Sequence, residues 1–150
     1  MDAVISGAAT HLLDSNVFLA GLEADPRRSE QIGRCLTRLR QMGGALATSS
    51  LILEEVFHVA WRISRDRRIA LRLVTEAGEA GVVLAVRAED HRRALALASE
   101  VALPPFNTRD YYHAAVMLNH GIRHIVSYDR DFDRFPGLIR VDPASPPGTA

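Results

Sequence analysis

Acidic residues follow short apolar runs at two distant places in the sequence. Asp14 comes directly after Thr10 to Leu13, and Asp129 and Asp131 follow Ile122 to Val126. If both runs are strands of a parallel sheet, their carboxyl ends meet at one edge and the three acids converge there. A pair of aspartates two residues apart also suits a solvated turn, so the pair by itself does not identify a site.

Two further acids fall in the predicted first turns of helices that would face the same edge. One is Asp110, and the other is Glu55 or its neighbour Glu54. Apolar residues flank Glu55 at helical spacing, which indicates that it faces buried surface, whereas Glu54 lies beside Leu51 and His58. A buried glutamate without a partner is costly. Periodicity alone does not choose between the two glutamates.

Four clustered carboxylates repel one another unless a cation or bound protons neutralise them. Oxygen ligands favour Mg²⁺ or Mn²⁺ over Zn²⁺, and such ions bind through a few carboxylates together with substrate phosphates. The chemistry that fits is metal-assisted hydrolysis of a phosphodiester. Each acid taken singly also fits a role at a helix terminus: Asp14 suits a helix N-cap, and Asp110 lies three residues after Asn107, as in a capping box. The prediction therefore depends on the four acids together.

His113 lies one helical turn after Asp110 and would line the same cleft, although packing is the commoner role for such a histidine. No mutual ligand spacing connects His58, His91, His120 and His124. The sequence contains no Gly-rich phosphate loop, no HExxH and no GxSxG. The carboxylates are therefore the strongest candidates for chemistry.

The elements that must position these acids alternate along the chain. Asp25 and Pro26 are typical of an N-cap and a first helical position, and Gly43 and Gly44 of a helix end. Strands are predicted at 10–13, 45–48, 82–86 and 122–126, with a short fifth at 138–141. Helices are predicted at 15–22, 26–42, from 49 or 50, 66–79, 89–101 and from 107 or 108 to 120. This alternation predicts a three-layer α/β/α sandwich around a mostly parallel sheet of four or five strands.

The bulk composition indicates one ordinary globular domain. The 150 residues are 47% hydrophobic and 24% charged, and no apolar run is long enough for a membrane helix. We expect the domain to cover residues 1–142 and the Pro-, Ser- and Gly-rich stretch 143–150 to be a disordered tail. The N-terminus lacks the basic region of a signal peptide, and the single cysteine, Cys35, reads as a core residue. We therefore expect a cytoplasmic protein.

Net charge is zero, which excludes a global basic field for nucleic acid. All 18 basic residues are arginine. A GC-rich genome accounts for this bias, and guanidinium groups also pair well with phosphates. Composition does not separate these two causes.

Four segments resemble, in order, the motifs of PIN-domain ribonucleases. "LLDSNVFL" at 12–19 is similar to the opening Asp-(Ser/Thr)-Asn motif, and "TSSLILEEV" at 48–56 is similar to the second, a serine followed six residues later by an acid. Counted from Ser49, that acid is Glu55. "RDYYHAAVMLNHG" at 109–121 and "IVSYDRDF" at 125–132 resemble the third and fourth motifs. The resemblance spans about residues 10–142, and compact members of this kind resemble VapC-type toxins of bacterial toxin–antitoxin pairs.

The resemblance implies a Mg²⁺- or Mn²⁺-dependent endoribonuclease that binds a cognate antitoxin in its cleft and forms a homodimer. The matched acidic quartet, expected to be catalytic and to bind metal, is Asp14, Glu55, Asp110 and Asp129. Supporting positions are Asn16, Ser127 and Asp131, the last also an alternative ligand. Candidate contacts to substrate are Ser15, Arg109, His113 and Arg130.

Two departures and two alternative functions accompany this resemblance. About ten residues precede the first strand, and the neutral charge makes RNA binding depend on local arginines such as Arg109, Arg130 and Arg134, which also suit surface solubility. One alternative is a PIN-fold module that binds protein partners and cleaves weakly. The other is a phosphohydrolase with Asp14 as nucleophile, but that chemistry usually needs a second acid where Asn16 stands.

Overall fold

A computed structural model describes residues 8–146 of the chain and shows one parallel sheet of five strands. The strands are β1 (His11–Leu13), β2 (Leu46–Ser49), β3 (Val82–Leu84), β4 (His124–Val126) and β5 (Ile139–Val141). Their order is β3-β2-β1-β4-β5, and every neighbouring pair is parallel. The predicted α/β fold with a parallel sheet is thus confirmed.

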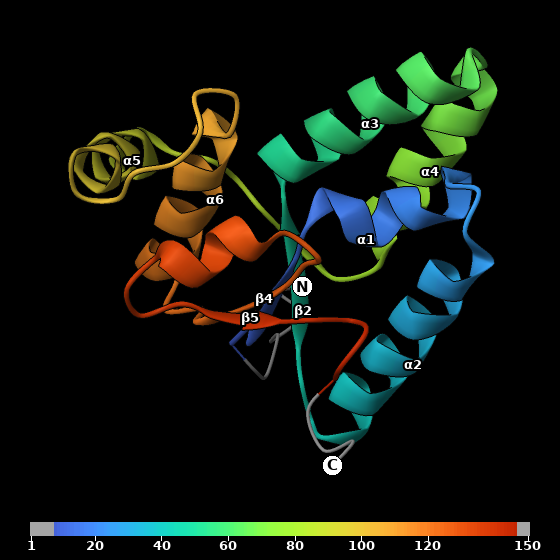
Figure 1. Ribbon diagram of the computed structural model, residues 1–150, viewed down its shortest axis with the longest axis horizontal. Coiled ribbons are helices and arrows are strands. Elements are labelled where there is room, and N and C mark those ends of the chain that lie inside the picture. Colours follow the sequence, from blue (N-terminus) through green and yellow to red (C-terminus); the bar gives the residue numbers. More distant parts are fainter. Residues whose placement is uncertain (1–7, 147–150) are drawn as a thin grey trace, which may run out of the picture.

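Helices cover both faces of the sheet. They are α1 (Ser15–Leu19), α2 (Pro26–Gln41), α3 (Ser50–Ser64), α4 (Arg67–Glu79), α5 (Ala88–Glu100) and α6 (Thr108–Asn119), with short 3-10 helices η1 (Ala20–Leu22) and η2 (Arg130–Arg134). Figure 1 shows α5 and α6 to one side of the sheet and α1 to α4 to the other. The three layers follow from strands that are apolar on both faces.

Alternate residues of the central strands pack into different cores. Leu12 of β1 and Ile125 of β4 belong to a core that includes α6, whereas Leu13 and Val126 pack with α2. Cys35 of α2 is buried in this second core, as predicted. Because side chains alternate along a strand, three-residue strands are enough to anchor helices on both faces.

Local sequence signals set the helix boundaries. The side chain of Asp25 accepts a hydrogen bond from the amide of Arg27, and Pro26 is the first residue of α2. Ser49 caps α3 by accepting from the amide of Ile52 at 3.2 Å. Gly43, with φ of +81°, follows α2 in the left-handed region that favours glycine. These caps place the first turn of α3 at the carboxyl end of β2.

The structure differs from the predicted elements in three places. The helix predicted at 15–22 divides into α1 and η1, and the stretch after Asp129 forms η2, which was not predicted. The strand predicted at 82–86 ends at Leu84, and its valines are exposed because β3 lies at the edge of the sheet. Burial on both faces needs neighbouring helices over both, which an edge strand lacks.

The last described residues follow β5. After β5, residues 143–146 form a turn in which the amides of Ala144 and Ser145 bond to Asp142. Residues 1–7, in the predicted N-terminal extension, and 147–150, in the predicted tail, lie outside the described residues. Within residues 8–146, no helix combines the length and apolar character needed to cross a membrane.

Strand order itself indicates where a site should lie. From β1 the chain moves to β2 and β3 on one side, and then β4 and β5 are added on the other side of β1. Ligands of open α/β sheets bind outside the carboxyl ends of the strands at such a reversal. Here that point is the crevice between the ends of β1 and β4.

Candidate active site

A cleft of about 410 Å³ opens at the carboxyl ends of β1 and β4. All four acids of the predicted quartet line it: Asp14, Glu55, Asp110 and Asp129. They come from four separate elements, namely the N-cap of α1, the second turn of α3, the first turn of α6 and the N-cap of η2. Helix starts that follow parallel strands face one edge, which is why residues so far apart in sequence converge.

Asp14 is held rigidly at the base of this cleft. Its Oδ1 accepts a hydrogen bond from the Ser15 amide at 2.7 Å, which caps α1. Its Oδ2 accepts from the side-chain amide of Asn16 at 3.0 Å and from the Ser127 hydroxyl at 2.6 Å. Burial raises the pKa of Asp14 and nearby Glu55 raises it further, against the lowering effect of Ser127 and other neighbours. A bound cation would relieve this cost of ionisation.

Ser127 connects the ends of the two central strands. Its buried hydroxyl donates to Asp14 and accepts from the backbone amide of Asp129 at 2.9 Å. The Asn16 side chain also donates to this hydroxyl, at 3.0 Å. Asn16 and Ser127 therefore connect the Asp14 carboxylate to the backbone at the start of η2.

The two aspartates of the last motif have different surroundings. Oxygens of Asp110, Asp129 and Asp131 lie within 4.8 Å of one another, close enough to share an ion. Asp129 lines the cleft, and its Oδ1 accepts from the Asp131 amide at 2.9 Å. Asp131 is already engaged: the Asn107 side chain donates to Oδ2, and the Arg134 Nε lies 3.4 Å from Oδ1. Asp131 therefore differs from Asp129 in having side-chain partners at both of its carboxylate oxygens.

Glu55 and Glu54 are separated by exposure and by partners. The Glu55 side chain is 24% exposed and lines the cleft, whereas the Glu54 side chain is 55% exposed and does not. His113, fully buried on α6, places its Nε2 at 3.5 Å from Glu55 Oε2. Burial alone would raise the pKa of Glu55, but His113 and Arg109 outweigh burial and lower it. The pKa of Glu55 is thus lowered where those of Asp14 and Asp110 are raised.

Asp110 is an acid whose ionisation is opposed both by its carboxylate neighbours and by burial. Burial and the nearby carboxylates of Asp14, Asp129 and Glu55 raise its pKa to about 7, although His113 opposes them. Its Oδ2 is buried and has no hydrogen-bond partner among residues 8–146. A buried carboxylate oxygen without a donor is costly unless a cation or a proton meets it. A group of carboxylates supplies only oxygen ligands, and one of these oxygens has no hydrogen-bond partner among the described residues. This arrangement fits a divalent cation that binds oxygen, such as Mg²⁺ or Mn²⁺.

Among the other residues near the motifs, Arg109 and Ser15 line the cleft, whereas Arg130 does not and Asn107 does not form the expected capping box. The capping-box interpretation of Asn107 is wrong, since its side chain makes no cap bond and donates to Asp131 instead. Arg109 lines the cleft and Ser15 lies on its α1 side. Arg130 is exposed and does not line the cleft, and Arg134 donates to the Ala102 carbonyl at 3.1 Å.

Sequence reasoning missed two residues at the mouth of the cleft. Phe106 and Thr108 both line it, and Phe106 is 83% exposed. The loop that holds Phe106 begins with Leu103-Pro104-Pro105 and lies between the helices predicted at 89–101 and from 107 or 108. An aromatic residue directly after a proline pair and before the third motif was the available signal.

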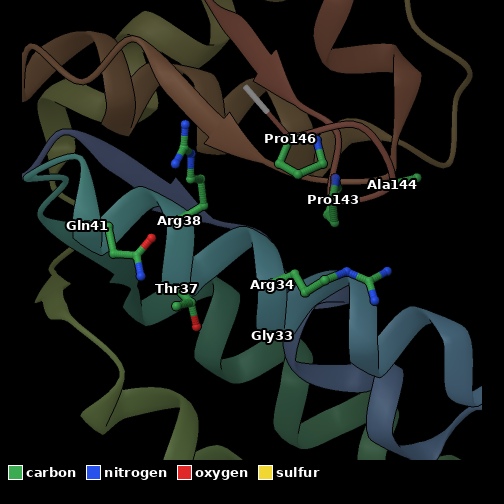
Figure 2. Close-up of a pocket in the computed structure, with 8 residues that line it drawn as sticks. All are labelled: Gly33, Arg34, Thr37, Arg38, Gln41, Pro143, Ala144 and Pro146. Atoms are coloured by element: carbon green, nitrogen blue, oxygen red, sulfur yellow. The ribbon is translucent and has the colours of Figure 1, made fainter. Parts of the chain in front are cut away.

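A larger groove of about 630 Å³ lies elsewhere, between α2 and the turn at 143–146 (Figure 2). Arg34 and Arg38 line its α2 side, and Pro143 and Pro146 line the other. It shares no lining residue with the acidic cleft. Size alone therefore does not mark the site, since the clustered carboxylates line the smaller cleft.

Comparison with known proteins agrees with this geometry. The family model described as the PIN domain matches residues 11–138. The chain is 31% identical over 134 residues to VapC ribonuclease Mb1869c of Mycobacterium bovis and to ribonuclease VapC13 of Mycobacterium tuberculosis, covering 87% of this chain and 98% of each relative.

Solved structures of VapC proteins share the fold. VapBC2 from Rickettsia felis, bound to a DNA fragment from its promoter, matches with a TM-score of 0.69 at 15% identity, over 87% of this chain and 96% of that chain. VapC20 of Mycobacterium tuberculosis, a toxin that cleaves the sarcin–ricin loop, matches with a TM-score of 0.66 at 20% identity, over 83% and 93%. The family match and the sequence relatives together show that this chain belongs to the PIN-domain family.

Proposed function

We propose that this protein is a metal-dependent endoribonuclease and the toxin of a type II toxin–antitoxin pair. The observation that carries the proposal is the acidic cleft, in which Asp14, Glu55, Asp110 and Asp129 converge from four elements. The relatives at 31% identity are named as ribonucleases, which supports RNA as the substrate. RNA also presents unpaired, splayed nucleotides that can enter a narrow cleft.

Mg²⁺ or Mn²⁺ would be held by these four carboxylates, and oxygens of Asp110, Asp129 and the neighbouring Asp131 lie within 4.8 Å of one another. When bound, such an ion supplies an activated water and stabilises the charge that develops on the phosphate oxygens. The Asp14 carboxylate is preset for this role because Ser127 and Asn16 donate to it, and Ser127 also accepts from the Asp129 backbone amide. Preset ligands avoid the entropy of ordering them when substrate binds.

Arg109 would contact the phosphate backbone. Its guanidinium lies at the wall of the cleft, and its side chain is 43% exposed. Its ion pairs are long, 3.6 Å to Glu54 and 4.0 Å to Glu55, so little energy holds it in place. A guanidinium suits a phosphate because it donates two parallel hydrogen bonds.

The test is cleavage of single-stranded RNA by wild type and Asp129→Asn in Mg²⁺ or Mn²⁺. We expect kcat/KM to fall by about 100-fold or more, as when a group that stabilises transition-state charge is removed. Asp133→Asn is the matched control, since Asp133 is exposed on the same 3-10 helix and does not line the cleft. A folded Asp129→Asn variant that cleaves as fast as wild type contradicts the proposal. If the wild type shows no RNA cleavage and no stabilisation by divalent ions, the result would instead favour a protein-binding module.

The proposal extends to partners. The matched Rickettsia structure is a VapBC complex, and we infer that a cognate antitoxin covers the acidic cleft of this chain in the cytoplasm, where the chain also pairs with a second copy. The test is to look for a short reading frame beside this gene and to co-express its product with this chain. A stable complex in which RNA cleavage is suppressed supports the toxin assignment, and free, active enzyme in the presence of that product contradicts it.

A further inference from the structure

A mainly apolar pocket of about 380 Å³ lies directly beside the acidic cleft. We call it the side pocket. Leu51 of α3, Val86 after β3 and Tyr112 of α6 form its apolar wall. Thr108 and Arg109 line both the side pocket and the acidic cleft. The two cavities are therefore neighbours with a shared wall. That wall carries the cation of Arg109, which forms a long ion pair, 3.6 Å, with Glu54 of the side pocket.

The aromatic part of this wall is fixed in place. Tyr112 lies three residues after Arg109 on α6, so both side chains project from one face of the helix. The Tyr112 hydroxyl is hydrogen-bonded to His91 Nδ1 of α5 at 2.8 Å, and the two rings lie 5.8 Å apart. A ring tethered at its polar end is a preformed surface for another flat group.

The rim of the side pocket is also ordered. Ser50, at the start of α3, accepts a hydrogen bond from the Val86 amide at 3.3 Å, which holds the segment after β3 against α3. The apolar lining, a few polar groups at the rim and the partial enclosure are typical of sites for small flat ligands. Because Arg109 stands between this pocket and the carboxylates, the ligand best suited to it carries a phosphate on one side.

We propose that the side pocket binds one nucleobase of the RNA substrate, next to the scissile phosphate. The base stacks on Tyr112, and Arg109 contacts the phosphate that connects this nucleotide to the cleft. The proposal rests on the proposed ribonuclease function and adds to it a subsite for substrate recognition. Aromatic side chains combined with a cation are the usual means of holding unpaired nucleotides.

The experiment uses the full chain and a single-stranded RNA oligonucleotide whose cleavage position in Mn²⁺ has been mapped with wild type. A second set of oligonucleotides carries one abasic nucleotide on either side of that position. Val86→Trp fills the side pocket. Val83→Trp is the matched control, because Val83 is exposed on the edge strand and does not line the pocket.

For wild type we expect the abasic nucleotide on one side to lower kcat/KM by about 5- to 150-fold, the range for loss of a base–aromatic stack. Val86→Trp should lower kcat/KM on intact RNA by a similar factor, and the abasic nucleotide should then cost it nothing further. Val83→Trp should behave as wild type. Such non-additivity is what a shared contact produces. If Val86→Trp does not fold, Tyr112→Leu, which removes the flat ring, replaces it. The same loss of kcat/KM on intact RNA and the same absence of a further abasic penalty are then expected of Tyr112→Leu.

An unchanged kcat/KM for Val86→Trp on intact RNA, or an abasic penalty equal to that of wild type, overturns the subsite. So does loss of antitoxin binding with RNA cleavage unchanged, which would assign the pocket to the protein partner. Failure of the proposed function looks different: wild type then cleaves no RNA, or Asp129→Asn cleaves it equally well, and the subsite falls with it. If only the subsite is wrong, wild type cleaves, Asp129→Asn does not, and Val86→Trp matches wild type.

Discussion

Replacing Asp110 with asparagine should stabilise the metal-free protein while disabling it. Burial and the neighbouring acids raise the pKa of Asp110 from 3.8 to about 7. Between these two pH values the folded chain holds a proton that the unfolded chain has released. The free energy of unfolding therefore falls as pH rises from about 4 to about 7, and stays low above that range. Asparagine does not ionise and avoids this loss.

The magnitude follows from the displacement of the pKa. About three pH units correspond to an upper bound of roughly 4 kcal/mol, at about 1.4 kcal/mol per unit. Asp110 retains some solvent exposure, so solvent screens part of the repulsion, and the amide introduces its own hydrogen-bonding needs. We therefore expect Asp110→Asn to gain about 1–2 kcal/mol at pH 8, and little at pH 4.

Urea unfolding measures this gain for wild type and Asp110→Asn at pH 4 and pH 8 in a chelating buffer. Adding Mn²⁺ at pH 8 should reverse the order of stability, because a ligand at about 100 times its Kd stabilises the wild type by about 2.7 kcal/mol and the variant by less. Asp133→Asn, on an exposed part of η2, is the control. It loses an ion pair with Arg140, so it should gain no stability at pH 8, and its response to Mn²⁺ should equal that of wild type.

Lower stability of metal-free Asp110→Asn at pH 8, by the same amount as at pH 4, would refute the reasoning. It would show that the Asp110 carboxylate gains more from its surroundings than repulsion removes. An increase in stability without loss of Mn²⁺ binding would refute only the second half, in which Asp110 is a ligand.

Three further predictions concern the same cleft. The apparent Mn²⁺ affinity of wild type should rise about tenfold between pH 6 and pH 8, since Asp110, with a pKa of about 7, must lose its proton to bind metal. Titration calorimetry in two buffers should show the released proton. An affinity that does not change with pH contradicts this prediction. Asp129→Asn should weaken Mn²⁺ binding more than Asp131→Asn, whose carboxylate is already bonded to Asn107, and the opposite order would make Asp131 the ligand. Phe106→Ala should leave the melting temperature unchanged, because the ring is 83% exposed. In a non-cleaving variant, the same substitution should weaken binding of single-stranded RNA by about 1–3 kcal/mol, as measured by fluorescence anisotropy. Unchanged RNA affinity would exclude stacking on Phe106.

The sequence by itself determined the architecture. Apolar runs of strand length alternate with capped amphipathic helices, and this pattern leaves few choices besides a parallel sheet covered on both faces. It also placed the acids, because the residues that follow parallel strands lie at one edge whatever the details of packing. Asp14 and Asp129 are located in this way by their positions after apolar runs. The motif resemblance added the selection of Glu55 over Glu54, which periodicity had left open.

Tertiary structure decided how each acid is held. The exposures of Glu54 and Glu55 separate the two residues, and the contact of Glu55 with His113 joins α3 to α6. The bond from Asn107 to Asp131 spans 24 positions and occupies the carboxylate that the motif left ambiguous. The side pocket is likewise formed by segments that lie far apart in sequence. Hydrophobic periodicity reports which face of an element is buried, but the partner that meets that face depends on how the helices and strands pack together.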